Sequence, residues 1–373
     1  MGTALGLFAA TRLLGVAVGA LTAWATDRHD GHPLALLGRS WDSLWYLGIA
    51  AHAYGRTLHF GPGVVQSDLA FFPLYPALVR AVAVLTPLGA GASGLVVSWS
   101  AAGVAACGIH ALGARLHGRA VGTALVLLRG LLPHSVVLSM AYTEPVLTAF
   151  AAWSLYAVLG GRRLWAGALA ALAGPARPNG FAVAAAVLAA AGCEAWRNRR
   201  RIGGVTHRLW TGAALAPLGW VAYVLWVGRR RGDLLGGYFE VQRRWGSTFD
   251  FGRASAHFVR HVLLHGGRFV FPMTMLIVAA AVVLYALLLA DRAPLPLLVH
   301  SGVLLLVALG GSGFFESKPR FLLPAFPLLL PLARALVRTA RARPWHAAVV
   351  AGALAGLSLA YGAYLVVIAD TPL

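Results

Sequence analysis

The sequence has little charge for its length. Only 12% of its 373 residues are charged and 59% are hydrophobic, whereas about a quarter of the residues of a soluble domain carry charge. Apolar runs of about 20 residues, long enough to cross a bilayer, recur along the whole chain. We therefore expect an all-α polytopic membrane protein that is surrounded by membrane lipids. Residues 1–373 should form a single membrane-embedded domain, without a second, soluble domain.

Lysine and cysteine are almost absent too. Lys318 is the single lysine in a chain of formal charge +19. The arginines cluster between apolar runs, which is typical of segments that face anionic headgroups, so no nucleic-acid partner is expected. Cys107 and Cys193 lack a metal or redox spacing. No carboxylate cluster suggests an ion site either, so we expect no metal and no cofactor.

Several familiar motifs are missing as well. The chain contains no P-loop, no G-x-G-x-x-G, no H-E-x-x-H and no G-x-S-x-G. These absences argue against a soluble nucleotide site, a zinc protease and an α/β-hydrolase.

Eleven apolar segments predict about eleven transmembrane helices. We interpret residues 4–25 as a retained first span, because the apolar run is too long for a signal-peptide core. The run 164–196 is interrupted at 174–180, which predicts a broken helix lining protein or a cavity. Two connections, 26–68 and 229–270, are long enough to be functional, and the first should carry interfacial helices. The predicted spans are 4–25, 69–88, 93–113, 119–138, 143–160, 164–196, 208–228, 271–290, 294–311, 321–338 and 346–368.

The arginine clusters predict the orientation. Excess arginine marks cytoplasmic segments, which places the first long loop and the 229–270 loop outside the cell. The expected location is the inner (plasma) membrane, with the active site facing outward. The arginines of the 229–270 loop break this rule, so either the span count is off by one or they meet an anionic ligand. The two cytoplasmic clusters are Arg197, Arg199, Arg200 and Arg201, and Arg338, Arg341 and Arg343.

Asp42 is the most suggestive carboxylate. It follows Trp41, and a helix capped by Ser40 would place it on one face with Trp45, Tyr46 and Ile49. A carboxylate among aromatic rings suits general-base chemistry on a sugar or a lipid-linked substrate. The alternative is an interfacial aromatic belt, in which Asp42 only begins a helix. We select as candidate site residues Asp42 for catalysis and Trp41, Trp45 and Tyr46 for substrate binding.

Glu144 and Asp68 are the other notable acids. Glu144 follows Tyr142 at the start of an apolar run, and an ionisable residue at membrane depth indicates function; alternatively it begins a helix with Pro145 beside it. Asp68 contributes to the site or caps the next helix. The remaining loop acids read as solvated groups, namely Asp27, Asp30, Asp233, Asp250, Asp291 and Asp370.

Basic and amide groups supply a second set of candidates. Lys318 and Arg320 lie at the outer end of a late span, and Arg177 and Asn179 lie at the helix break. Arginine binds phosphate oxygens with two parallel hydrogen bonds and lysine acts as a point charge, so these residues are candidates for binding a lipid phosphate. The alternative is that they snorkel at an interface.

Four stretches in order resemble the PIG-V type mannosyltransferases, relatives of the second GPI mannosyltransferase within the GT-C class. The resemblance implies an inverting transfer of mannose from a polyprenyl-phosphate carrier to a lipid or other extracytoplasmic hydroxyl. It implies that Asp42 is the base, that Glu144 supports the site and that Arg320 matches a late arginine; Phe321 replaces the family's usual tyrosine. The stretches are WDSLWYLGIAAHAY (41–54), FFPLYPALVR (71–80), AYTEPVL (141–147), and ARPNG (176–180) with KPRFLLPAFPL (318–328).

Two functions from other classes remain open. A transporter or flippase of lipid-linked sugars would also use a helix break near the midplane, although such proteins often contain internal repeats and none is visible here. A non-catalytic partner subunit of such a transferase would keep the same residues. The acceptor is not identified by any motif.

Overall fold

The computed structural model is an α-helical protein, as predicted, with 81% of the described residues in helices. It describes residues 1–26, 33–59, 65–199 and 207–369. A small antiparallel hairpin, β1 (Thr57–His59) with β2 (Val65–Ser67), interrupts the first long loop. The sequence interpretations of Asp27, Asp30, Arg200, Arg201 and Asp370 concern residues outside the described ranges.

The helices follow one another through short turns. They are α1 (Gly2–Ala25), α2 (Pro33–Gly38), α3 (Asp42–His52), α4 (Leu74–Leu85), α5 (Ala90–His117), α6 (Arg119–Gly130), α7 (Glu144–Leu159), α8 (Arg163–Ala173), α9 (Phe181–Asn198), α10 (His207–Leu215), α11 (Leu218–Arg231), α12 (Gly237–Arg244), α13 (Arg253–His265), α14 (Val270–Ala290), α15 (Leu295–Gly310), α16 (Lys318–Leu322), α17 (Leu330–Ala342) and α18 (Pro344–Ala363). Short 3₁₀ turns are η1 (Asp68–Ala70), η2 (Ser135–Ser139), η3 (Gly174–Ala176), η4 (Pro178–Gly180), η5 (Phe315–Ser317) and η6 (Phe326–Leu329), and a π turn follows, η7 (Tyr364–Ile368).

Six of the described helices are long and apolar enough to cross a bilayer, and a bent pair, 315–322 with 326–342, adds a seventh if it counts as one span. The predicted number of about eleven is therefore not confirmed. Three predicted spans correspond to the shorter helices α4, α7 and α15. At a rise of about 1.5 Å per residue, helices of this length do not reach across a hydrocarbon core of about 30 Å. Apolar sequence here marks burial against other helices as well as contact with lipid.

The run 164–196 is broken where the sequence predicts it. Helix α8 ends at Ala173 and α9 begins at Phe181, with η3 and η4 between them. Pro175 and Pro178 supply no backbone N–H to a helical ladder, so the chain turns instead of continuing as one helix. The break presents Arg177 in extended backbone, with φ at −166°. This places a guanidinium inside the bundle.

Small residues allow helices to pack closely on this side of the bundle. A Cβ atom added to Gly167 of α8 would lie 2.1 Å from the carbonyl oxygen of Gly212 in α10. No side chain larger than hydrogen fits at that distance, so glycine lets the two backbones touch. Close approach of this kind is a common way to join helices in membranes.

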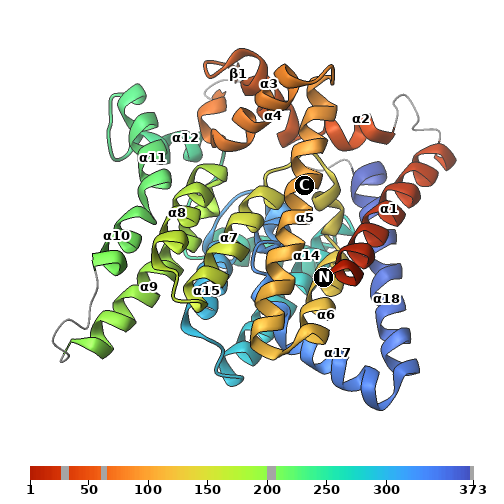
Figure 1. Ribbon diagram of the computed structural model, residues 1–373. Helices are drawn as coiled ribbons and strands as arrows, with labels where there is room; N and C mark the ends of the chain where they lie inside the picture. Colours follow the sequence, from red (N-terminus) through yellow and green to blue (C-terminus); the bar gives the residue numbers. More distant parts are fainter. Residues whose placement is uncertain (27–32, 60–64, 200–206, 370–373) are drawn as a thin grey trace.

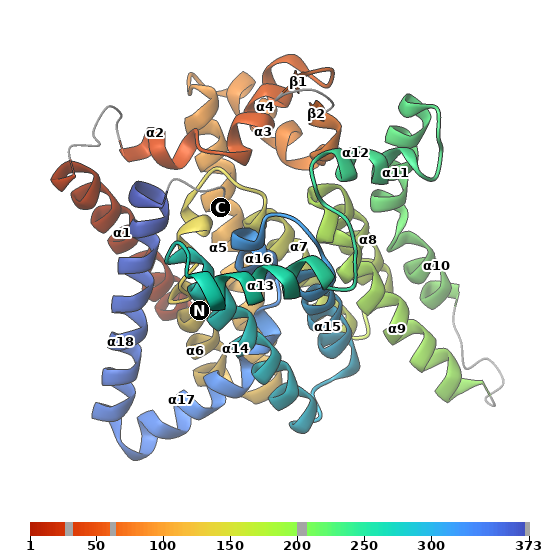
Figure 2. The same cartoon turned by 180° about the vertical axis from the view of Figure 1, so that it is seen from behind.

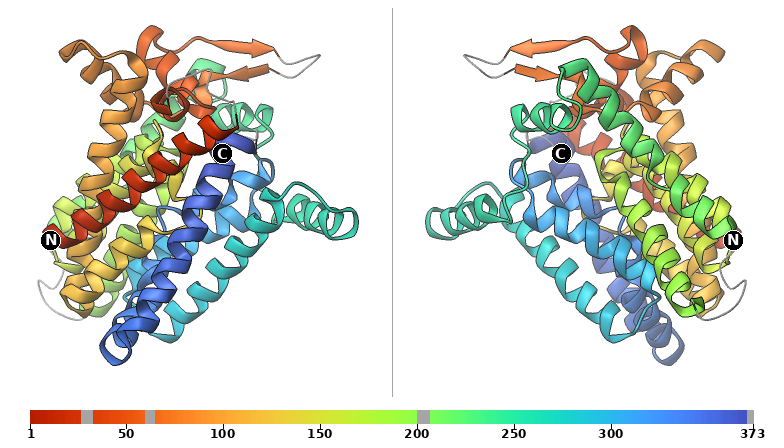
Figure 3. Two further views of the ribbon diagram at one scale, coloured as in Figure 1. Left: turned by 90° about the vertical axis from the view of Figure 1, so that its right-hand side faces the viewer. Right: turned by 90° about the vertical axis from the view of Figure 1, so that its left-hand side faces the viewer.

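Short elements gather at one end of the bundle, which we name the capped end: α2, α3, the β1–β2 hairpin, α4 and α12 (Figures 1 and 2). Both long connections contribute to it. The hydroxyl of Tyr223 in α11 joins this layer to the bundle, because it donates to the carbonyls of Leu69 (3.0 Å) and Phe71 (2.6 Å). Helix α13 projects sideways from the bundle (Figure 3). The functional residues lie just beneath the capped end.

Candidate functional site

Helix α3 presents Asp42 at its first residue. The predicted Ser40 cap is wrong, because Trp41 is the N-cap residue and the Ser40 hydroxyl donates to the carbonyl of Leu36. Trp41 holds φ at 53°, a left-handed conformation. That conformation is uncommon for a bulky residue, and backbone strain of this kind concentrates at functional sites. It aims Asp42 toward the centre of the protein.

Helix α7 begins at Glu144, whose side chain is fully buried. The segment before it is tied to α5, since the Ser98 hydroxyl donates to the carbonyl of Tyr142 (2.9 Å). An acid in the first turn suits the positive end of the helix dipole, and Pro145 in that turn costs no hydrogen bond. Burial without solvent requires partners for this carboxylate.

Two arginines from distant parts of the chain supply those partners. Arg177, between η3 and η4, donates from Nη1 to Oε1 of Glu144. Arg320, in the short helix α16, has its Nε 3.1 Å from the same Oε1 and its Nη2 2.6 Å from Oδ2 of Asp42. Its guanidinium also lies 5.1 Å from the centre of the Tyr142 ring. Stretches from the first loop, the middle and the last part of the sequence thus meet at one point.

We name Asp42, Glu144, Arg177 and Arg320 the four-charge cluster. Two carboxylates and two guanidinium groups cancel in formal charge. The carboxylates differ in access: the side chain of Glu144 is 0% exposed, whereas that of Asp42 is 25% exposed. Asp42 is therefore the carboxylate that a ligand can reach. Glu144 binds both arginines from the buried side of the cluster.

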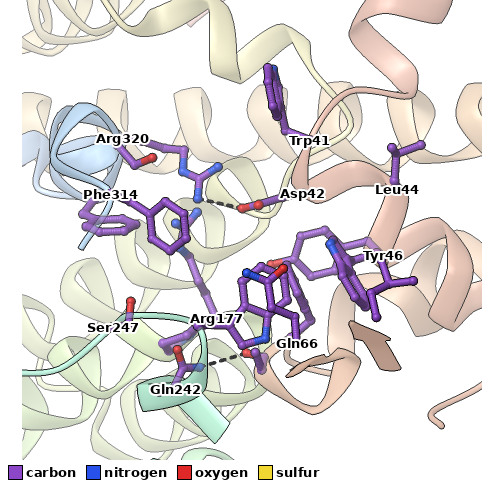
Figure 4. A pocket seen from close by; sticks show the side chains of 18 of the residues that line it. Trp41, Asp42, Leu44, Tyr46, Gln66, Arg177, Gln242, Ser247, Phe314 and Arg320 are labelled. Atoms are coloured by element: carbon purple, nitrogen blue, oxygen red, sulfur yellow. Dashed lines mark hydrogen bonds and ion pairs between the residues drawn. The ribbon is translucent and has the colours of Figure 1, made fainter. Parts of the chain in front are cut away.

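A cavity of about 490 Å³, which we name the first cavity, opens onto this cluster (Figure 4). The Asp42–Arg320 ion pair stands on one side of it, and the Arg177 side chain runs along the lining toward this pair. Its lining includes Trp41, Asp42, Trp45, Arg177, Trp245 and Arg320. A cavity of this size accommodates a sugar ring with adjoining groups.

Aromatic rings form one wall of the first cavity. Trp45 stacks on Phe71 with ring centres 5.6 Å apart and meets the edge of Trp245 at 5.1 Å. The guanidinium of Arg56 lies 5.5 Å from the Trp45 ring centre. Tyr46 lines the same cavity. The structure thus brings the aromatic residues predicted from the first loop to Asp42.

Sequence reasoning missed part of this lining. Trp245 and Gln242 come from the second long loop, and Phe314 precedes α16. Phe314 holds φ at 38°, so a second strained aromatic residue borders the cavity. The arginine-rich composition of the second loop had pointed only to an anionic ligand. Its tryptophan was the available signal for a wall of the cavity.

Other predicted residues lie elsewhere. Asp68 is buried and accepts from the backbone N–H groups of Gly55 and Arg56, both at 2.8 Å, so it shapes the turn after α3. Tyr142 is buried beneath Arg320. Lys318 donates to the carbonyls of Ala308 (2.6 Å) and Gly311 (2.7 Å) at the end of α15.

A second cavity of about 470 Å³ lies beside the first. Asn179 and Lys318 line it, and Arg177, Gln242 and Phe321 line both cavities. In the described parts of the chain, no group of three or more histidine, cysteine, aspartate or glutamate side chains could hold a metal ion.

The fold can be compared with solved structures. The oligosaccharyltransferase of Archaeoglobus fulgidus in its apo form matches with a TM-score of 0.55 and 13% identity, over 99% of this chain and 56% of that one. That enzyme is a glycosyltransferase of the GT-C class, so the fold of this chain is similar to a GT-C fold. The same archaeal enzyme, AglB, in complex with an inhibitory peptide and a dolichol-phosphate matches with a TM-score of 0.53 and 13% identity, over 99% and 56%.

At 13% sequence identity, the likeness to these structures is one of fold alone. The chain spans about half the length of the GT-C structures that it matches. It matches no family model and no curated protein. Both solved structures are of a membrane glycosyltransferase. The several long apolar helices are those of a multi-pass membrane protein.

Proposed function

We propose that this protein is an inverting membrane glycosyltransferase that moves mannose from a polyprenyl-phosphate carrier to a hydroxyl on a lipid or other extracytoplasmic acceptor. The observation that carries the proposal is the exposed carboxylate of Asp42, 2.6 Å from Arg320, at an aromatic cavity beneath the capped end. The fold supports it, as does the dolichol-phosphate bound to AglB. The PIG-V-like stretches at 41–54, 141–147 and 318–328 support mannose as the sugar.

The chemistry uses one base. Asp42 accepts the proton of the acceptor hydroxyl while that oxygen attacks the anomeric carbon of the donor sugar. The bond between the anomeric carbon and the phosphate oxygen breaks, and the electron pair leaves with the polyprenyl phosphate. A phosphate leaving group needs no second carboxylate as general acid, unlike hydrolysis of an ordinary glycoside. One accessible carboxylate therefore suffices.

The aromatic wall has a matching task. The faces of Trp45 and Trp245 lie beside Asp42 in the first cavity. Flat aromatic faces pack against the C–H surface of a sugar ring, and the amides of Gln66 and Gln242 can bond its hydroxyls. Binding of this kind holds the ring next to the base, where orientation supplies much of the rate.

The supporting group is Glu144. It binds both Arg177 and Arg320, so it fixes where the two guanidinium groups stand relative to Asp42. Arg320 in turn holds the Asp42 carboxylate in place through the 2.6 Å ion pair. We place the site on the outer face of the plasma membrane, where lipid-linked sugars replace nucleotide sugars as donors.

The test is direct transfer by the detergent-purified chain. Radiolabelled polyprenyl-phosphate mannose and a cell lipid extract are supplied together, and labelled products are separated from the donor. We expect a labelled product and free polyprenyl phosphate in equal amounts, with no transfer from a nucleotide-linked mannose. The helix break at 174–180, which lines both cavities, also suits a transporter. Movement of intact donor across liposomes without product would replace the transferase with that function.

A further inference from the structure

The second cavity differs from the first in its charge. Its lining includes the cations Arg177, Arg243 and Lys318 and no carboxylate. Arg177 is already matched by Glu144. Arg243 forms no ion pair with any residue in the described ranges, and the Lys318 ammonium donates to two backbone carbonyls rather than to an acid. Two cationic charges thus face this cavity without a matching carboxylate in its wall.

Asp250 does not supply the missing charge in the wall. Its two oxygens accept from the backbone N–H groups of Gly252 (2.9 Å) and Ala254 (2.8 Å), which fixes the start of α13. It is not part of the lining of the second cavity. Glu240 pairs with Arg244 on the exposed face of α12. The charge of Asp250 acts on Lys318 from outside the wall, and no described carboxylate lines the cavity to compete with a bound anion.

A buried amide adds a second, independent observation. Asn179 is only 6% exposed, it lines the second cavity, and its Nδ2 has no hydrogen-bond partner among the described residues. A buried N–H₂ group left without an acceptor costs free energy, so such groups are normally satisfied by protein, water or ligand. An oxygen of a ligand in the second cavity would satisfy it.

The four-charge cluster is a poor place for an added anion. Its two guanidinium groups are matched by two carboxylates, so a phosphate brought there meets negative charge as well as positive. Arginine in a balanced pair has fewer donors left for phosphate oxygens; in Arg320, the buried Nη1 is left without a hydrogen-bond partner among the described residues. Arg243 and Lys318 have no such competitor. The sequence predicts that Arg320 and Arg177 bind a phosphate. The charges of the second cavity instead favour Arg243 and Lys318 for that role.

We propose that the second cavity binds the phosphate group of a lipid, held by Arg243, Lys318 and the Asn179 amide. The apolar side of the cavity, with Phe181, Trp220 and Phe249, packs against the first part of the lipid chain. The identity of the lipid rests on the proposed function. In a transferase of that kind, the phosphate belongs either to the polyprenyl carrier or to a phospholipid acceptor. Arg177 separates this group from Asp42 and contacts ligands on both sides.

The experiment measures equilibrium binding by the purified full chain in detergent. The probes are a fluorescent polyprenyl phosphate, phosphatidylglycerol, inorganic phosphate and uncharged polyprenol. The variants are Arg243→Gln and Asn179→Leu. Arg244→Gln is the matched control, because Arg244 is the next residue of the same helix, is paired with Glu240 and lines neither cavity. Thermal unfolding of every variant verifies the fold.

We expect Arg243→Gln to weaken polyprenyl phosphate binding about tenfold, since a hydrogen bond to a charged group contributes that much to affinity. Asn179→Leu should weaken it several-fold, and Arg244→Gln should leave it unchanged. Tighter binding of phosphatidylglycerol than of polyprenyl phosphate, with the same dependence on Arg243, assigns the cavity to an acceptor lipid. Binding of inorganic phosphate alone, without a gain from the lipid chain, overturns the lipid part.

The proposal and the proposed function fail separately. If Asp42→Asn abolishes transfer but polyprenyl phosphate binding keeps its dependence on Arg243, both stand. If no transfer is found with any donor while binding depends on Arg243, only the enzymatic proposal falls. Binding that survives Arg243→Gln and Asn179→Leu but disappears in Arg320→Gln would place the phosphate at the four-charge cluster and overturn the inference.

Discussion

The two cavities are nearly equal in size, about 490 and 470 Å³, and they share Arg177 and Phe321 as a wall, yet their chemistry differs. The first ends in a balanced cluster of two acids and two arginines, and Arg56 adds a cation at its aromatic wall. The second presents cations without an acid in its lining. Ion pairs hold the base in place, whereas positive charge without a paired acid attracts an anion. Reaction and phosphate binding can thus be divided between neighbouring spaces.

The residues of the two sites come from different kinds of element. The acids of the four-charge cluster come from helix starts, Asp42 of α3 and Glu144 of α7, where the helix dipole favours negative charge. Its arginines come from the break between α8 and α9 and from α16. The short helix α16 serves both sites, because it supplies Arg320 to the cluster and Lys318 to the second cavity, to which α12 adds Arg243. Each prediction below tests one side of this contrast.

The largest effect is expected from Asp42→Asn. Amide replaces the base without changing its size, so transfer should fall about a thousandfold, within the range for loss of a general base. Binding of polyprenyl phosphate in the second cavity should persist. Asp291→Asn is the control, because Asp291 pairs with Arg334 away from both cavities. Near-normal transfer by folded Asp42→Asn protein would remove Asp42 from the mechanism.

Glu144→Ala should break the charge balance itself. It leaves two buried guanidinium groups without their shared carboxylate, which costs about 3–5 kcal/mol of unfolding free energy. Denaturant or thermal unfolding in detergent measures the loss. The control is Glu194→Ala, since the Arg163–Glu194 pair is partly exposed, and such a pair contributes less than about 1 kcal/mol. Equal losses in the two variants would contradict a special role for Glu144.

Trp41→Gly separates the ring from the backbone. Trp41 has a positive φ, which glycine adopts without strain, so the melting temperature should not fall. Loss of the ring beside Asp42 should reduce transfer about tenfold, comparable to one lost aromatic contact with a ligand. Trp41→Phe should restore most of the activity. A lower melting temperature with unchanged transfer would make Trp41 a structural residue only.

Glu240→Gln should have the smallest effect. The hydrogen bond from Arg244, together with its charge, lowers the pKa of Glu240. A lowered pKa means that the pair stabilises the fold above the unfolded pKa and that this contribution is lost as pH falls through the folded pKa. Both side chains are exposed, so unfolding at pH 7 should not change measurably. A clear change in phosphate binding would show that α12 positions Arg243 through this pair.

Much of the site could be predicted from short stretches of sequence. Asp42 among tryptophans, Glu144 at the start of an apolar run and Arg177 at a Gly-Pro interruption each had a local signal, because charge is rare in this chain. No local signal predicted how these charged residues pair with one another. Which arginine meets which acid depends on how α7, α16 and the break pack, and these elements are far apart in sequence.

The number of membrane spans could not be predicted from hydropathy alone. Hydropathy identifies residues that avoid water, and α4, α7 and α15 avoid it by burial in protein as well as in lipid. Lys318 shows a limit for side chains: the sequence places it beside Arg320, but nothing in the sequence indicated that its ammonium also donates to the final carbonyls of α15 and lines the second cavity. Trp245 and Phe314 escaped notice because loops carry no periodic pattern.

The wall that the two cavities share can couple sugar transfer in the first cavity to phosphate binding in the second. Arg177 lines both cavities. If a ligand in one cavity shifts this side chain, it changes the affinity of the other cavity, and such coupling is reciprocal by thermodynamic necessity. A spent carrier that stays in the second cavity would alter acceptor binding in the first. Turnover would then follow the departure of polyprenyl phosphate into the bilayer, making product release, rather than bond making, the step on which speed depends.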